Sequence, residues 1–182
     1  MLFQYQPYFF TLQVMKKITL TGPESSGKTT IAQRLAMDFN APLVPEYART
    51  YLNQLNRPYQ QSDLWEIAQA QLLAEKKAAE TEAHYLFCDT DLWTILIWSE
   101  EKYGTVDPRI SNALVQQKTD LYLLLQPTLP WTYDPQRENP NDRDRLFQRY
   151  RNKLRTYQQP YLEIDPTDKN FYKKIIIGLA QI

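Results

Sequence analysis

The sequence predicts an α/β fold in which a five-stranded parallel sheet forms the middle of three layers, with helices on both faces. Short apolar segments alternate with helix-forming segments along the chain, which is typical of such a sheet. Residues 120–127, DLYLLLQP, are apolar almost throughout, as expected for a strand that is covered on both faces. A chain of 182 residues with 43% hydrophobic residues is long enough for one domain with a buried core.

Each strand is expected where a run of apolar and β-branched residues is too short for a helix. The second strand should end near Glu46, and the third should run into Asp89 and Asp91. In chain order, the expected strands are residues 17–21, 41–48, 85–91, 120–127 and 161–166.

Helices are expected between these strands. Apolar residues recur at helical spacing in residues 28–39. A long helix is expected from Ser62, its N-cap, to about Ala83, because good helix formers dominate that segment. Three further helices are expected from Leu92, over residues 142–159 and from about Asp168.

The chain is expected to hold one domain, over residues 16–182. An extension at residues 1–15 precedes it and lacks the positive start and long apolar centre of a secretory signal. This extension is either of little consequence or an aromatic arm that covers a sheet edge or a partner. A helical lid is expected at about residues 128–159, where a proline-rich stretch leads into an arginine-rich one.

The composition excludes some classes of protein. The formal net charge is zero, which argues against a nucleic-acid binder. No apolar run approaches the roughly 18 residues that cross a bilayer, so no membrane association is expected. A single cysteine, Cys88, cannot form an internal disulfide, which fits the reducing cytoplasm.

Residues 22–29, GPESSGKT, fit the P-loop pattern G-x-x-x-x-G-K-[ST], between an expected strand and an expected helix. The two glycines let successive backbone N–H groups point at phosphate oxygens. Lys28 would neutralise the β- and γ-phosphates, and the Thr29 hydroxyl would hold Mg²⁺. The pattern predicts a P-loop NTPase fold that binds a nucleoside triphosphate through Gly22, Pro23, Glu24, Ser25, Ser26, Gly27, Lys28, Thr29 and Thr30.

Acidic residues end two other expected strands, at the sheet edge where ligands gather. Asp89 fits the acid that binds Mg²⁺ directly or through water. Asp91 either joins this site or caps the helix that starts at Leu92. Glu46 would accept the proton of an attacking hydroxyl, and Arg49 would align the γ-phosphate. Alternatively, Glu46 starts a helix and Arg49 is its surface ion-pair partner.

Six arginines follow the fourth expected strand, and most of them are expected to be structural. Arg137 and Arg143 are the two expected to reach the transferring phosphate when a lid closes. Trp131 and Tyr133 either stack on a flat ring or pack the lid. Structural roles are expected for three other residues, with Cys88 and Trp98 in the core and His84 at the end of the long helix. Trp93 is expected near the site.

Four motifs, TGPESSGKTT, PEYARTYL, FCDTDLWT and WTYDPQRENPNDR, occur in this order. Together they resemble the ribosylnicotinamide kinase domain of the bacterial NadR proteins. The resemblance implies a stand-alone module that uses ATP and Mg²⁺ to phosphorylate the 5′-hydroxyl of nicotinamide riboside, giving nicotinamide mononucleotide for NAD salvage. It implies Lys28, Glu46, Asp89 and Arg137 as catalytic residues, Thr29 and Asp89 as metal ligands, and a substrate site with Glu46, Tyr47, Arg49, Asp91, Trp131 and Asp134.

One residue departs from this family. Pro45 stands where well-known members have a tryptophan that helps to enclose the nicotinamide ring, and Tyr47, Trp93 or Trp131 are candidates to replace it. Two alternatives therefore stay open: a kinase of another small nucleoside or metabolite, and a nucleotide-dependent regulatory ATPase without a small-molecule acceptor. The sequence does not determine the oligomeric state.

Overall fold

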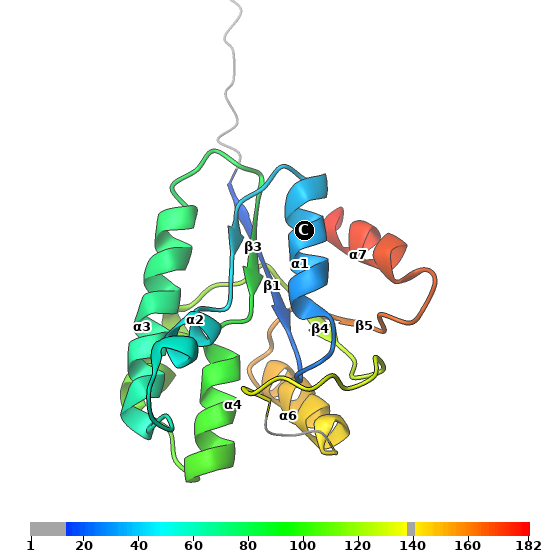
Figure 1. The fold of residues 1–182 in the computed structure, drawn as a ribbon. Helices are drawn as coiled ribbons and strands as arrows, with labels where there is room; N and C mark the ends of the chain where they lie inside the picture. Colours follow the sequence, from blue (N-terminus) through cyan, green and yellow to red (C-terminus); the bar gives the residue numbers. More distant parts are fainter. Residues whose placement is uncertain (1–13, 138–140) are drawn as a thin grey trace, which may run out of the picture.

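The computed structural model describes residues 14–137 and 141–182 and contains one five-stranded sheet between two layers of helices (Figure 1). All strand pairs are parallel, and the strand order is β2-β3-β1-β4-β5. The predicted fold class is confirmed. The strands are β1 (Lys16–Thr21), β2 (Leu43–Val44), β3 (Tyr85–Asp89), β4 (Leu121–Leu125) and β5 (Tyr161–Ile164).

Seven helices in the described residues cover the two faces of the sheet. Helices α1 and α7 pack on one face, and α3, α4, α5 and α6 pack on the other (Figure 1). The helices are α1 (Lys28–Asp38), α2 (Tyr47–Gln54), α3 (Gln61–Ala78), α4 (Leu92–Tyr103), α5 (Pro108–Gln116), α6 (Arg143–Thr156) and α7 (Phe171–Leu179).

Strand β4 shows why the central strands read as continuous apolar runs. Leu123 and Leu125 pack on the α1 and α7 side, whereas Tyr122 and Leu124 pack on the side of α4 and α6. Successive side chains of a strand point to opposite faces, and both faces are covered here. Every residue of β4 is therefore buried.

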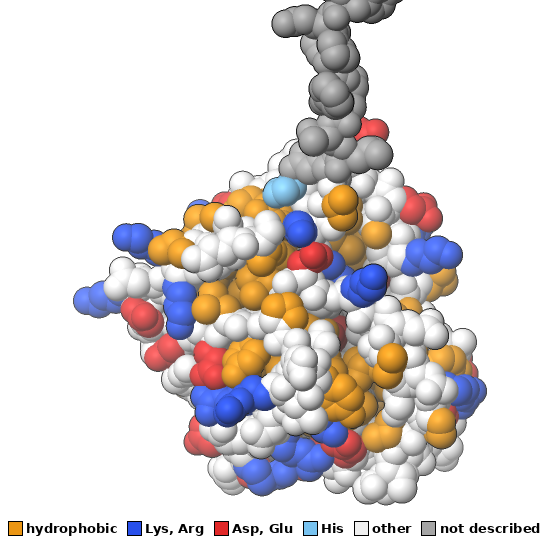
Figure 2. Space-filling model, turned by 180° about the vertical axis from the view of Figure 1, so that it is seen from behind, with side chains coloured by type: hydrophobic (Ala, Val, Ile, Leu, Met, Phe, Trp, Pro, Cys, Tyr) orange, Lys and Arg blue, Asp and Glu red, His pale blue; other side chains and the backbone are white. Residues whose placement is uncertain are grey.

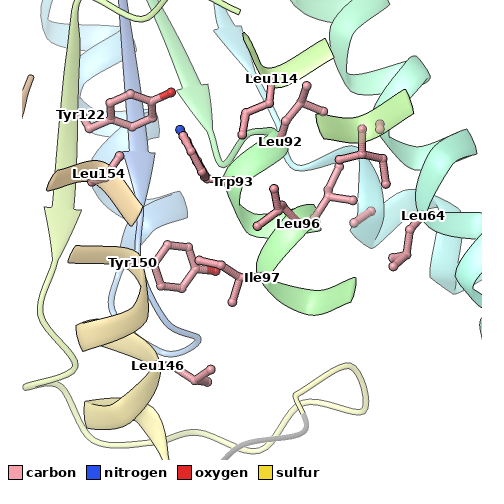
Figure 3. Packing of buried hydrophobic residues seen from close by; sticks show 14 of the residues in the cluster. Leu64, Leu92, Trp93, Leu96, Ile97, Leu114, Tyr122, Leu146, Tyr150 and Leu154 are labelled. Atoms are coloured by element: carbon pink, nitrogen blue, oxygen red, sulfur yellow. The ribbon is translucent and has the colours of Figure 1, made fainter. Parts of the chain in front are cut away.

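Helix α4 lies in the middle of the larger core cluster. Figure 3 shows Trp93 of α4 lying between α4 and Tyr122 of β4, and Tyr150 of α6 lying beside Ile97. Trp93 is 3% exposed and its ring contacts Tyr157 at a centroid distance of 4.8 Å. The expectation that Trp93 lies near the site is therefore wrong, because it is a core residue.

The second strand is shorter than the sequence predicted. Only Leu43 and Val44 pair with β3, and Glu46 is the N-cap of α2. Pro45 interrupts the segment, since proline lacks the N–H that a longer ladder would need. Glu46 thus starts a helix, as the alternative interpretation held, while it still follows the carboxyl end of a strand.

Helix α5 was not predicted, and α2 was expected only in the alternative interpretation of Glu46. Helix α5 follows Asp107, whose carboxylate accepts from the Arg109 N–H at 2.9 Å, and Pro108 occupies its first turn. An N-cap aspartate directly before proline is a recognisable helix start. The sequence therefore contained a signal for α5.

The ends of α3 also differ from the prediction. Its N-cap is Gln60, whose N–H donates to Asp63 Oδ2 at 2.6 Å, so Ser62 lies within the first turn. The helix ends at Ala78, and His84 lies beyond it, where its backbone carbonyl accepts from Lys16 N at 2.8 Å. His84 therefore does not terminate the long helix.

The surface shows charges of both signs. On the face seen in Figure 2, Lys and Arg side chains are interspersed with Asp and Glu side chains and with apolar areas. In the described parts of the chain, none of the helices has the length and apolar character needed to span a bilayer. The proposed role of residues 1–13 as an aromatic arm falls outside the described residues.

Candidate active site

The phosphate loop connects β1 to α1 and has the backbone that its glycines predict. Gly22 has φ of 129° and Gly27 has φ of 87°, and Ser25 between them has φ of 54°. A Cβ atom on Gly22 would lie 2.6 Å from the Leu125 carbonyl oxygen of β4. The loop therefore needs glycine at position 22 both for its conformation and for space.

Lys28 lies within this loop. Its Nζ donates to the Gly22 carbonyl at 2.9 Å and to the Pro23 carbonyl at 2.8 Å. Burial lowers the pKa of Lys28, while the carboxylates of Glu46 and Asp89 act in the opposite direction. An ammonium that is desolvated and held by two carbonyls is ready to exchange them for phosphate oxygens.

Thr29 and Asp89 form the pair expected at a magnesium site. The Thr29 hydroxyl donates to Asp89 Oδ2 at 2.6 Å, joining the start of α1 to the end of β3. Asp89 is 2% exposed, and its other oxygen, Oδ1, is buried with no hydrogen-bond partner among the described residues. A buried carboxylate oxygen without a donor fits a cation or its bound water.

The residues that follow Asp89 separate two acidic side chains. Thr90 has φ of 71°, a left-handed conformation that is unusual for a β-branched residue and is found at functional sites. Asp91 turns away from the loop, accepts from Trp93 N at 3.0 Å and accepts from Tyr122 Oη at 2.7 Å. Burial raises the pKa of Asp91 to about 6. Asp91 therefore caps α4, and the structure does not bring it to the site.

A cavity of about 310 Å³ opens directly beside the phosphate loop. Its walls come from the loop itself, from the start of α2, from α4, and from the segments before and within α6. Glu46 and Arg49 line it at the start of α2, and Arg137 and Tyr150 line it from the lid region and α6. The carboxyl ends of β1 and β3 point toward these helices (Figure 1). The cavity is thus placed for an acceptor next to a bound triphosphate.

Glu46 lies where the cavity meets the loop. Its side chain is 15% exposed, and burial raises its pKa, with the Lys28 ammonium acting in the opposite direction. Arg49 Nε lies 3.9 Å from Glu46 Oε2. A carboxylate with a raised pKa beside a phosphate-binding lysine is a candidate general base.

The lid segment, defined here as residues 128–137, lies across the phosphate loop and α2. Trp131 Nε1 donates to Glu24 Oε1 at 2.8 Å, and Arg49 Nη1 donates to Asp134 Oδ2 at 2.7 Å. Arg137 lines the cavity and donates to the Thr132 carbonyl. Trp131 and Asp134 therefore brace the lid segment. Neither of them lines the cavity, and Tyr47 of α2 does not line it either.

The remaining arginines have mostly structural partners. Arg143 donates to the Leu129 carbonyl at 2.9 Å and to the Ser25 carbonyl at 3.4 Å, which ties the start of α6 to the lid segment and to the phosphate loop. Arg145 and Arg149 both bind Glu101 of α4. Arg151 pairs with Glu163 of β5 at 2.6 Å. Of the two arginines singled out from the sequence, the structure brings Arg137 to the cavity.

Sequence reasoning missed the aromatic part of the cavity. Trp98 of α4 and Tyr59, just before α3, both line it, although Trp98 was expected in the core. The available signal was helical spacing. Thr94, Trp98 and Glu101 follow the Asp91 cap at successive intervals of three, four and three residues, and therefore share one face of α4.

Comparisons with known proteins give a family and relatives. The model of a family described as "AAA domain" matches residues 17–170. The trifunctional NAD biosynthesis/regulator protein NadR of Salmonella typhimurium is 26% identical over 148 residues, and that of Escherichia coli is 28% identical over 146 residues. These alignments cover 78% of this chain and 34% of each relative, so the chain spans about a third of their length. The resemblance to NadR is confirmed.

Solved structures share the fold. A crystal structure of NadR protein in complex with NR has a TM-score of 0.74 and 20% identity, covering 94% of this chain and 52% of that chain. Thymidylate kinase from Ehrlichia chaffeensis has a TM-score of 0.61 and 13% identity, covering 92% and 99% of the two chains. Deoxyadenosine kinase from M. mycoides has a TM-score of 0.52 and 15% identity, covering 91% and 99%. Identities this low establish the fold alone.

Proposed function

This chain belongs to the AAA domain family, and we propose that it is a P-loop nucleoside kinase. The proposed reaction transfers the γ-phosphoryl group of ATP to the 5′-hydroxyl of nicotinamide riboside and gives nicotinamide mononucleotide. The observation that carries the proposal is the cavity of about 310 Å³ that opens beside the phosphate loop, with Glu46 at the junction. A nucleotide-binding switch would need the loop but not this cavity.

The nucleotide would bind through residues 22–30. Backbone N–H groups of the loop and the Lys28 ammonium would hold the β- and γ-phosphates, with the start of α1 adding its positive end. Thr29 and Asp89 would hold Mg²⁺, which would offset negative charge on the phosphates. In the described residues there is no group of three or more His, Cys, Asp or Glu side chains placed for a metal ion. A site completed by phosphate oxygens and water needs no such group.

The chain's own residues would carry the chemistry. Glu46 would accept the proton as the 5′-hydroxyl attacks the γ-phosphorus in line, and the bond to the β-phosphate oxygen would break. Arg49 and Arg137, which both line the cavity, would bind the equatorial oxygens of the transferring group. The lid segment and α6, at residues 128–159, would exclude water from the cavity.

The choice of acceptor rests on the relatives. Two relatives are described as NAD biosynthesis proteins, and one structural neighbour is described as a complex with NR. These names support a small-molecule nucleoside as the acceptor and nicotinamide riboside as the first candidate. The proposed kinase domain is residues 16–182, with residues 1–15 as an extension.

The test is product detection by mass spectrometry. The purified full chain would be incubated with ATP, Mg²⁺ and a panel of nicotinamide riboside, uridine, cytidine and adenosine. Nicotinamide mononucleotide as the fastest-formed product, absent with Lys28→Ala, would support the proposal in full. Another phosphorylated nucleoside would overturn the choice of acceptor. ADP formation without any phosphorylated nucleoside would overturn the kinase assignment.

A further inference from the structure

Two chemically different groups of side chains line the cavity beside the phosphate loop. The charged group comes from the loop, from α2 and its N-cap, and from the lid segment, namely Lys28, Glu46, Arg49 and Arg137. The apolar and aromatic group comes from α2, from the residues before α3 and from α4, namely Leu52, Tyr59, Ile97 and Trp98. A ligand that fills this cavity would have a polar part at the site of phosphoryl transfer and a flat or apolar part some distance away.

Trp98 presents part of its ring to the cavity. Residues 92–97 and Ser99 of α4 are all buried, whereas Trp98 is half-buried and packs against the core with its other side. An aromatic side chain that keeps one accessible face inside a cavity provides a stacking surface at little cost in conformational entropy.

Tyr59 is held in place opposite α4 by contacts with the end of that helix. The Tyr103 hydroxyl donates to the Tyr59 carbonyl at 2.8 Å, and the two rings meet edge to face at a centroid distance of 6.3 Å. Gln61 Nε2 donates to Thr105 Oγ1 at 2.9 Å and adds a second tie between the start of α3 and the residues after α4. The wall of the cavity at Tyr59 is therefore built before any ligand binds.

Two charged side chains near Trp98, Lys102 and Glu101, are occupied by contacts within the protein. The Trp98 ring is therefore the stacking surface of the cavity. Lys102 Nζ lies 3.5 Å from the centroid of the Tyr59 ring and covers one face of it. Glu101 lines the cavity, but its carboxylate is bound by Arg145 and Arg149, and these ion pairs lower its pKa. Glu101 therefore is a structural link between α4 and α6 and does not act as a ligand-binding carboxylate.

We propose that Trp98 and Tyr59 form the base-binding end of the acceptor pocket, with the planar base of a nucleoside stacked on Trp98 and bordered by Tyr59. This proposal deepens the proposed kinase function and rests on it for the identity of the acceptor. The candidates suggested from the sequence, Tyr47, Trp93 and Trp131, do not line the cavity, so Trp98 is the residue that specifies an aromatic base.

Binding measured by calorimetry in the absence of ATP tests this proposal separately from catalysis. The probes are nicotinamide riboside and, in parallel, any nucleoside that proves to be a better acceptor. Trp98→Ala is expected to raise the Kd of the nucleoside by at least ~5-fold, the effect of losing one base–aromatic stack. Trp98→Phe should restore most of the affinity, because phenylalanine keeps a stacking face.

The control is Trp65→Phe in α3. The Arg109 guanidinium lies over Trp65, with Arg109 Cζ 4.9 Å from the centroid of the Trp65 ring. Trp65 does not line the cavity. This variant should bind the nucleoside as the wild type does, and thermal unfolding would show that each variant is folded. The Kd of ATP should stay within about twofold in Trp98→Ala, because Trp98 belongs to α4 and is not part of the phosphate loop.

Unchanged nucleoside affinity in a folded Trp98→Ala chain would overturn the proposal, and so would an equal loss of affinity for ATP. Tyr59→Ala gives a second check, with a smaller loss of nucleoside affinity expected. The kinase function can fail independently. If the wild type binds a nucleoside through Trp98 but forms no phosphorylated product, the base-binding end stands and the catalytic proposal falls.

Discussion

Arg49 Nη1 lies 2.7 Å from Asp134 Oδ2, although 85 residues separate them in the chain. Gln136 Nε2 adds hydrogen bonds to the Arg49 carbonyl at 3.2 Å and to Asn53 Oδ1 at 2.7 Å. These contacts fasten the lid segment to α2. Arg49 keeps Asp134 ionised, since its guanidinium holds the pKa of that carboxyl below the usual value. The pair therefore fixes the position of an arginine that lines the cavity.

Replacing Asp134 by asparagine should release Arg49 and slow phosphoryl transfer. We expect kcat/KM to fall by about 10- to 100-fold, the effect of a small misplacement of a substrate-aligning group. The free energy of unfolding should change by less than ~1 kcal/mol, because Arg49 is 44% exposed and such ion pairs are weak. Steady-state kinetics and thermal unfolding measure the two effects.

The matched control for Asp134 is Asp38→Asn. Asp38 also accepts from an arginine, Arg34 Nε at 2.7 Å, but on α1 and away from the cavity. It should leave kcat/KM unchanged. Equal activity of Asp134→Asn and the wild type would contradict the positioning role of Asp134.

Gly22→Ala should disrupt the phosphate loop. The added Cβ would lie 2.6 Å from the Leu125 carbonyl oxygen, and the backbone φ of 129° is strained for alanine. We expect the free energy of unfolding to fall by ~2 kcal/mol or more, together with loss of nucleotide binding. Chemical denaturation and ATP calorimetry measure these changes.

Gly104→Ala is the control for Gly22→Ala, because it introduces backbone strain without a steric clash. Gly104 has φ of 70°, but nothing lies within 4 Å of an added Cβ. The free energy of unfolding of Gly104→Ala should fall by only ~1 kcal/mol, and the variant should bind ATP normally. If both variants lost the same stability, the close approach of Gly22 to β4 would have no energetic consequence.

Glu46→Gln should lower the activity of the protein and raise its stability. Burial raises the pKa of Glu46 above its ordinary value, so its ionisation opposes folding. Stability that is present below about pH 4.5 is lost as the pH rises through the raised pKa. The glutamine variant should therefore be more stable than the wild type at pH 7, with the difference shrinking in acid, and should lose most of its activity.

The same residue should set the acidic limb of the pH–rate profile. As a general base, Glu46 must be deprotonated, so kcat/KM of the wild type should rise with pH through a pKa above 4.5. The residual activity of Glu46→Gln should lack this limb. A limb that persists in the variant would assign the base to another group.

Thr29→Val should raise the requirement for Mg²⁺. The variant removes the hydroxyl that donates to Asp89 Oδ2 at 2.6 Å, so that neither oxygen of this buried carboxylate keeps a donor among the described residues. Activity should fall on the order of 100-fold, as when one stabilising group of an active site is removed. Thr29→Ser keeps the hydroxyl and should stay within a few-fold of the wild type. An unchanged Mg²⁺ titration for Thr29→Val would exclude this pair as the metal site.

Much of this architecture was predictable because its determinants are local. The phosphate loop is a contiguous segment with a strand before it and a helix after it, and its glycines adopt the positive φ values that the pattern requires. Asp89 is the last residue of a buried strand next to β1, so the parallel register brings it to the loop. The five strands were recognised because short apolar runs covered on both faces are distinctive.

Short or proline-interrupted elements were harder to predict. Strand β2 has two residues, and α2 begins directly after Pro45 and Glu46, so neither periodicity had room to develop. Asp91 could have been a metal ligand or a helix cap by sequence alone. The left-handed Thr90 decides this, because it turns two acids only two residues apart in opposite directions.

The sequence by itself determined the parallel sheet, the phosphate loop and the Thr29–Asp89 pair, because hydrophobic period and motif spacing are properties of short segments. Only the tertiary structure decided that Trp98 faces the cavity while Trp93 is buried, and that Arg49 is held by Asp134. The cavity beside the phosphate loop is lined by several separate segments of the chain. Which of their side chains meet depends on how the helices pack on the sheet, and no local pattern records that packing.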